Sequence, residues 1–126
     1  MSDPTDPLRG VRELCLALPE TTERLSHGEH TWFVRGRTVF VSYADRHHDD
    51  VLGIWCAAAA GTQEALVAAD PDRFYRPPYV GHRGWVGVRL DVPVDWDEVG
   101  ELVVDAFRVV APARLTARLE VAYPPE

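Results

Sequence analysis

The residues best suited to chemistry lie between positions 73 and 89, where arginines alternate with aromatic side chains. This stretch contains no acidic residue, although the whole chain carries 20 acidic and 13 basic residues and a net charge of −7. Arginines hold phosphates while aromatic rings stack on bases or other π systems. The stretch therefore indicates a surface for nucleic acid or for a small anionic or aromatic ligand. The same pattern also fits aromatic side chains that cover a core and arginines that lie at the surface.

A second basic segment, Arg35-Gly36-Arg37, lies between two short runs of β-forming residues. Together the two segments supply the candidate nucleic-acid or ligand-binding residues, which are Arg35, Arg37, Arg76, Tyr79, His82, Arg83, Trp85 and Arg89. The first function predicted from them is that of a non-enzymatic DNA-binding protein, which contacts phosphates and bases through arginine-bearing hairpins and an aromatic sheet face. With so few arginines, DNA binding would be weak and salt-sensitive, and the overall acidity disfavours a strongly electrostatic nucleic-acid binder. The alternative is a small-ligand or protein-binding module in which Tyr79, Trp55 and Trp85 line a pocket or an interface and Arg83 holds an anionic group.

No metal site, cofactor or catalytic residue is predicted. The histidine-rich segments, residues 27–30 and 47–50, lack the spacing that directs two ligands at one ion, so solvated loop histidines are favoured. The available nucleophiles are Ser26, Ser42, Cys15 and Cys56, and none lies in a recognised catalytic pattern. Both cysteines share apolar faces with leucine or isoleucine and are expected to be buried and inert. An enzyme is therefore the least supported function.

Helices are predicted at both ends of the chain. Asp6-Pro7 begins one, and its apolar periodicity continues until Pro19. Residues 62–69 form a short helix that ends before Asp70-Pro71. Asp95 begins a strongly amphipathic helix with acidic residues near its positive end. Pro112 ends that helix before a short one that reaches Leu119.

Four strands are predicted between these helices, at residues 31–34, 38–41, 51–56 and 85–90. Residues 20–29 are polar and are expected to be irregular. The order of the elements, a helix followed by consecutive strands and then by helices, predicts an α+β fold. This fold is a two-layer sandwich of an antiparallel sheet with the N- and C-terminal helices on one face. Alternation then directs Trp85 toward the open face, where Trp55 joins it, and exposed aromatic residues there would mark an interface.

The length of 126 residues fits a single domain, here predicted over residues 6–119 with flexible ends at 1–5 and 120–126. No apolar run approaches the length of about 20 residues that crosses a bilayer, so no membrane contact is expected. The first residues lack the features of a secretion signal, and the cysteines lack a CxxC spacing, which together favour the cytoplasm. The absence of lysine and asparagine is typical of a GC-rich bacterial genome.

The chain resembles the MmcQ/YjbR family over about residues 6–119. The resemblance is carried by residues 73–85 with the sequence RFYRPPYVGHRGW, by DWDE at 95–98, by LALPETTE at 16–23 and by the predicted hairpin at 31–43. It implies a frataxin-like sandwich, described in that family as a double wing and proposed to bind DNA. It implies no reaction, cofactor or catalytic residue. Iron binding, as in frataxins, is not implied either, because the first helix lacks an acidic ridge.

Overall fold

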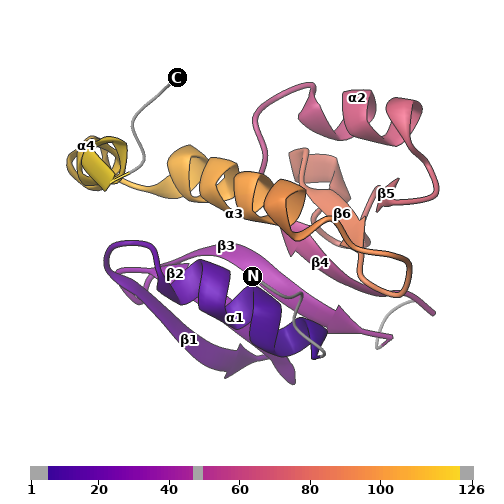
Figure 1. The fold of residues 1–126 in the computed structure, drawn as a ribbon, viewed down its shortest axis with the longest axis horizontal. Coiled ribbons are helices and arrows are strands. Elements are labelled where there is room, and N and C mark those ends of the chain that lie inside the picture. The colour runs from indigo at the N-terminus through magenta and orange to yellow at the C-terminus, as the bar shows by residue number, and fades with distance from the viewer. Residues whose placement is uncertain (1–5, 47–49, 123–126) are drawn as a thin grey trace.

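The fold is a six-stranded antiparallel sheet with helices α1 and α3 packed on one face (Figure 1). The computed structural model describes residues 6–46 and 50–122. The strands lie in the order β1-β2-β3-β4-β6-β5. Their bounds are β1 Thr21–Ser26, β2 Glu29–Val34, β3 Thr38–Asp45, β4 Leu52–Cys56, β5 Phe74–Tyr75 and β6 Val86–Arg89. The helices are α1 Pro7–Leu16, α2 Thr62–Ala69, α3 Trp96–Val110 and α4 Ala113–Ala122, with a short 3₁₀ helix η1 at Gly81–Arg83. The predicted α+β sandwich is confirmed.

Aspartate caps set the starts of the two long helices. The Asp6 side chain accepts a hydrogen bond from the backbone N–H of Leu8, and Pro7 occupies the first turn of α1. The Asp95 side chain accepts from two N–H groups in the first turn of α3. Each cap satisfies donors that the helix itself leaves without a partner. Helix α4 begins after Pro112, as predicted, and continues past Leu119 to Ala122. The rest of the predicted flexible ends lies outside the described residues.

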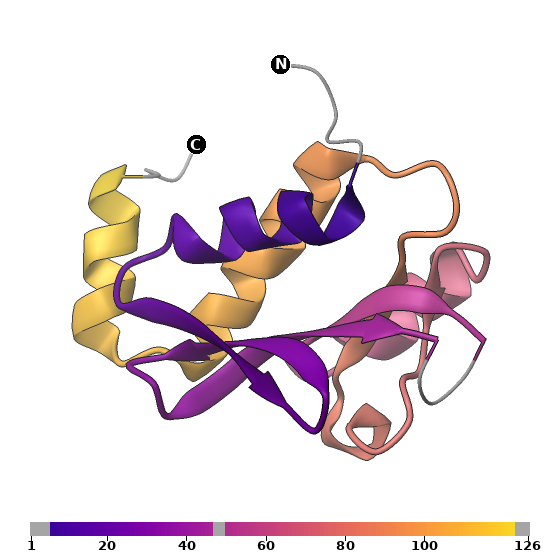
Figure 2. The same ribbon diagram turned by 90° about the horizontal axis from the view of Figure 1, so that it is seen from below.

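The core lies between the sheet and the α1–α3 layer (Figure 2). Phe107 of α3 meets Phe40 of β3 edge to face, with ring centroids 5.9 Å apart and an interplanar angle of 82°. Helix α1 in turn packs on α3. Cys15 and Cys56, whose thiols were predicted to be buried, are both fully buried in this core. Burial raises the pKa of the Cys56 thiol to about 12 and that of the Cys15 thiol well above its ordinary value.

The prediction that residues 20–29 are irregular is wrong, because they form β1, its turn and the start of β2. The turn is His27-Gly28, and both residues have positive φ, as a two-residue hairpin turn of type I′ requires. Strand β1 lies at the edge of the sheet, where polar side chains are common, so it lacks an apolar run. The two-residue strand β5, at the opposite edge, was also not predicted.

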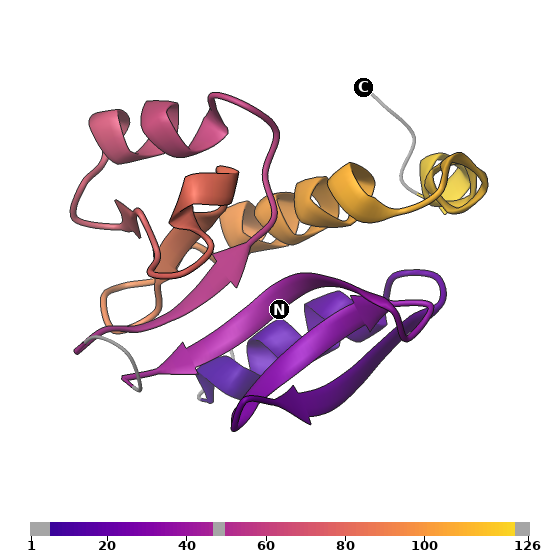
Figure 3. The ribbon, with the colours of Figure 1, turned by 180° about the vertical axis from the view of Figure 1, so that it is seen from behind.

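An irregularity in the β2–β3 pair decides which side chains reach the open face of the sheet. Trp32 pairs with Val41, whereas the next residue, Phe33, pairs with Val39, so β3 has one residue more than β2 at this point. The shift makes Val39, rather than Phe40, the partner of Phe33. Phe33 and Val39 therefore line the open face, while Phe40 is fully buried beneath the helices, like Trp32. Figure 3 shows this open face of β1–β3 with α1 behind it.

Candidate functional site

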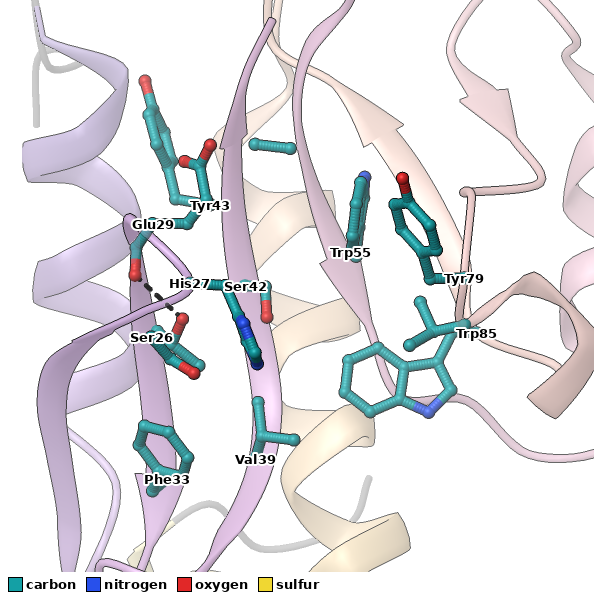
Figure 4. Close-up of a pocket in the computed structure, with 13 residues that line it drawn as sticks. Ser26, His27, Glu29, Phe33, Val39, Ser42, Tyr43, Trp55, Tyr79 and Trp85 are labelled. Atoms are coloured by element: carbon teal, nitrogen blue, oxygen red, sulfur yellow. Dashed lines mark hydrogen bonds between the residues drawn. The ribbon is translucent and has the colours of Figure 1, made fainter. Parts of the chain in front are cut away.

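A pocket of about 480 Å³ lies on the open face of the sheet, opposite the helices (Figure 4). Thr31, Ser42 and Trp55 are consecutive cross-strand partners on β2, β3 and β4, and they form its floor. The small side chains of Thr31 and Ser42 leave space that the large Trp55 then borders. Five of the thirteen lining residues are aromatic, namely Phe33, Tyr43, Trp55, Tyr79 and Trp85. The pocket therefore arises from a cross-strand row of small and large residues.

Both candidate tryptophans lie on the open side, as their alternation predicts, but neither forms an exposed patch. Trp55 is 8% exposed and Trp85 is 4% exposed. Tyr75 accepts a hydrogen bond from Trp55 Nε1 at 3.1 Å, and its ring lies directly over Gly87. A Cβ atom at Gly87 would lie 2.5 Å from that ring, so glycine is required for Tyr75 to approach the sheet. The expectation of an exposed aromatic surface is thus replaced by two tryptophans that line a pocket.

The wall beside Trp85 is the loop that contains η1, and Gln63 of α2 holds this loop in place. Gln63 is buried, and its Nε2 donates to the carbonyl oxygens of Gly81 at 2.8 Å and of Trp85 at 2.5 Å. These two carbonyls lie at the two ends of the loop, so one amide fixes both. Sequence reasoning did not identify Gln63 as important; a polar side chain at a position that α2 must bury was the only signal.

Tyr79 lies at the mouth of the pocket, where 71% of its surface is exposed. Its backbone φ of 65° is a left-handed conformation that is uncommon for an aromatic residue. The ring centroids of Tyr79 and Trp55 are 6.5 Å apart, with the planes tilted by 49°. Such conformations persist where the surrounding structure enforces them, and they cluster at functional sites.

The predicted arginine surface is divided between separate parts of the molecule. Arg76 packs against Gly81, and the guanidinium of Arg83 lies over the Trp85 ring, 5.4 Å from its centroid. These two residues and the exposed His82 belong to the η1 side. Arg35 and Arg37 lie in the β2–β3 turn, at the α4 end of the molecule (Figure 2). The structure therefore does not bring the eight candidates together.

Arg89, another candidate, is already paired. Its guanidinium donates two hydrogen bonds to the carboxylate of Asp91, at 2.9 and 3.0 Å. The hydrogen bond and the charge of Asp91 raise the pKa of Arg89, and Arg89 in turn lowers the pKa of Asp91. A phosphate would have to displace this carboxylate, which makes Arg89 the weakest candidate among the arginines.

Arg35 belongs instead to a cluster that sequence reasoning did not find. Three guanidinium groups surround the carboxylate of Glu20: Arg118 Nη1 at 3.0 Å, Arg35 Nε at 3.6 Å and Arg114 Nη2 at 3.9 Å. Arg114 and Arg118 lie one turn apart on α4, far along the chain from the β2–β3 turn. One carboxylate cannot balance three guanidinium groups, so this cluster is a positive region on an acidic protein.

Residues 6–46 and 50–122 contain no group of three His, Cys, Asp or Glu side chains that could hold a metal ion. Of the histidine segments, His47, His48 and Asp49 lie outside the described residues. His30 points to the helix side, where its Nδ1 is 3.1 Å from Glu23 Oε2. Glu23 also accepts two hydrogen bonds from Arg12 and one from Trp32, and these lower its pKa against the effect of burial. This network joins α1 to the sheet.

The fold and the site together define the class of protein. It is a two-layer α+β sandwich whose helices α1 and α3 cover one face of the sheet and leave a pocket on the other face. The same fold is found in the crystal structure of Deinococcus radiodurans protein DR2400, which has a DUF419 domain. The likeness has a TM-score of 0.73 at 18% sequence identity and covers 90% of this chain and 85% of that chain. The sequence model of the YjbR family matches residues 16–109.

The chain therefore belongs to the YjbR family, as the resemblance in the sequence predicted. No match is found among curated proteins. In the part of the chain that the structure describes, no helix is both long and apolar enough to cross a membrane.

Proposed function

We propose that this YjbR domain binds a small organic molecule with a compact apolar body in the open-face pocket. The observation that carries the proposal is the pocket itself, about 480 Å³ in volume, with Phe33, Trp55, Tyr79 and Trp85 among the residues that line it. Small-molecule sites typically measure about 300–1,000 Å³ and combine apolar walls with a few polar groups. Here the polar groups include Thr31 and Ser42 on the floor.

The construction of the walls supports this function. Gln63 fixes the η1 loop by two hydrogen bonds, and Tyr75 fixes Trp55 by another. Walls that are held before a ligand arrives lose little conformational entropy on binding. The strained backbone at Tyr79 is confined to the mouth, where a ligand would enter.

Tryptophan fluorescence tests the proposal, since Trp55 and Trp85 line the pocket and report on anything that enters it. A panel of small aromatic and branched aliphatic compounds is titrated into the wild type and into Ser42→Leu, which fills the floor. Thr38→Leu is the matched control, because Thr38 is an exposed residue of the same strand and lies outside the lining. We expect saturable changes in the wild type and in Thr38→Leu only. Equal binding by folded Ser42→Leu, or no response to any compound, would contradict the proposal.

Nucleic-acid binding is the second candidate, and the specific observation that favours it is the cluster around Glu20. Arg35, Arg114 and Arg118 surround that carboxylate, and Arg37 lies in the same turn as Arg35. Among the described residues, Arg37 forms no ion pair, so it is available to a phosphate. Duplex DNA would contact this end of the molecule, rather than the pocket, through phosphates alone.

Fluorescence anisotropy of labelled DNA across a salt series tests this candidate. Neutralising Z phosphates gives a slope of about −0.9Z in log affinity against log salt for a duplex. Arg118→Ala should then flatten the slope by about one unit, while Arg83→Ala and Trp85→Ala on the η1 side leave it unchanged. If Arg83→Ala and Trp85→Ala change the slope while Arg118→Ala does not, the DNA-binding site lies at the η1 loop instead. If the wild type does not bind DNA even at low salt, DNA binding is excluded.

A further inference from the structure

The floor of the open-face pocket carries two hydroxyl groups, and only one of them is used within the protein. Thr31 Oγ1 donates a hydrogen bond to the backbone carbonyl oxygen of Glu29 at 3.0 Å. Ser42 is half-buried in the lining, and its hydroxyl forms no hydrogen bond with any residue in 6–46 and 50–122. In Figure 4 this hydroxyl lies on the side of β3 that faces Trp55. It is therefore a hydrogen-bonding group left open to the pocket.

An available hydroxyl on the floor constrains what binds above it. A serine hydroxyl donates one hydrogen bond and accepts others. Water satisfies such a group in solution, and a ligand that covers the floor displaces that water. A ligand without a polar group at this point leaves the hydroxyl without a partner, which weakens binding. Ser42 therefore favours a ligand that directs one hydrogen-bonding group at the floor.

The walls on either side of this floor are aromatic. Phe33 lies on the β2 side, and Trp55, Tyr79 and Trp85 lie together on the other side (Figure 4). Aromatic rings that meet offset or edge to face contribute binding free energy beyond the area that they bury. An aromatic ring over the floor meets such partners on both sides, whereas a saturated ring gains from burial alone.

One ring in each wall is fixed from outside the pocket. The guanidinium of Arg24 lies 3.7 Å from the centroid of the Phe33 ring, and that of Arg83 lies 5.4 Å from the centroid of the Trp85 ring. Neither arginine belongs to the lining. Arg24 is itself fixed by a hydrogen bond to the carbonyl oxygen of Gly36. Ring orientations that are set before binding reduce the entropy lost when a ligand enters.

We propose that the pocket selects an aromatic molecule with one hydrogen-bonding group. Its ring lies between Phe33 and the wall of Trp55 and Trp85, and its polar group meets the Ser42 hydroxyl. Ser42 is thereby the residue that determines specificity. This inference rests on the proposed function, since it names the class of ligand for the same pocket. It depends on hydrogen bonding and ring contacts, so uncharged compounds are sufficient to test it.

Three uncharged probes of similar size test the inference: benzyl alcohol, ethylbenzene, which lacks the hydroxyl, and cyclohexylmethanol, which lacks the aromatic ring. Each is titrated against the whole chain with tryptophan fluorescence as the readout. Ser42→Ala should weaken benzyl alcohol about three- to tenfold and should not weaken ethylbenzene. Thr38→Ala, at an exposed position of the same strand outside the lining, should change neither affinity. After correction for transfer from water to octanol, cyclohexylmethanol should bind the wild type several-fold more weakly than benzyl alcohol.

The outcomes separate the two proposals. If Ser42→Ala weakens benzyl alcohol and ethylbenzene by the same factor, or weakens neither, the inference is wrong and the proposed function stands. Equal corrected affinities for benzyl alcohol and cyclohexylmethanol would overturn the role of the aromatic walls. If no probe binds, both proposals are contradicted for ligands of this size. Should Ser42→Ala fail to fold, Ser42→Cys gives the same comparison, because a thiol keeps the side-chain shape but forms weaker hydrogen bonds.

Discussion

Gln63 provides the sharpest test of how the pocket wall is held. Gln63→Leu keeps a side chain of similar size but removes the Nε2 donor, which bonds the carbonyl oxygens of Gly81 and Trp85. Each hydrogen bond contributes about 0.5–1.5 kcal/mol net, and a buried acceptor left without a partner costs about 1–3 kcal/mol. The carbonyl oxygen of Gly81 still accepts from the N–H of Gly84, so only the carbonyl of buried Trp85 is exposed to the larger penalty. We therefore expect the free energy of unfolding to fall by about 1.5–4 kcal/mol.

Equilibrium urea denaturation measures this loss, with circular dichroism and tryptophan fluorescence as parallel probes. Ala68→Leu, an exposed position on the same helix, is the control and should change the free energy of unfolding by no more than about 0.5 kcal/mol. A comparably small change in Gln63→Leu would refute the argument, because the loop would then be held by packing alone. A large change with an altered m-value would instead indicate that the loop is unfolded in the native state of the variant.

The remaining predictions concern packing, thiol access and pH. Gly87→Ala should lower the free energy of unfolding by about 1–3 kcal/mol, because its Cβ would meet an aromatic ring, whereas Gly100→Ala in α3 has room and should raise it by about 0.5–1 kcal/mol in the same denaturation assay. Cys15 and Cys56 should not react with a thiol reagent such as Ellman's reagent in the native state and should both react in urea, since burial raises both pKa values. The hydrogen bonds from its arginine partner lower the pKa of Glu23 below its ordinary 4.5, so ionised Glu23 stabilises the fold above pH 4.5 and this contribution is lost as the pH falls through the lower folded value. Glu23→Gln should therefore flatten the acid limb of a stability–pH curve, and an unaltered limb would contradict this.

The helices and central strands could be predicted because their signals are local. Asp6-Pro7 and Asp95 mark helix starts by chemistry that needs only the next few residues. Strand β1 was missed because an edge strand needs no apolar run, although the His27-Gly28 pair was an available sign of a hairpin turn. Strand β5 is too short to produce a pattern of its own.

The candidate site was predicted only in part, for a different reason. Alternation correctly directed Trp55 and Trp85 to the open face, but it does not show that Tyr75 and the η1 loop cover them. The pairing of Arg89 with Asp91 could have been found, since Asp91 lies only two positions after Arg89, just past the end of β6. The cluster of α4 arginines around Glu20 joins segments about a hundred positions apart, and no local pattern reports such a contact.

The packing of α3 on the sheet has a consequence for how the chain folds as it is synthesised. Strands β1 to β4 are neighbours in both sequence and space, so their hairpins can form early. Phe40, however, meets its partner Phe107 only after nearly the whole chain has been made, and α1 likewise needs α3. Until α3 leaves the ribosome, the apolar face of the nascent sheet remains uncovered. Chains that end before α3 should therefore be held by chaperones or aggregate rather than accumulate as a soluble sheet.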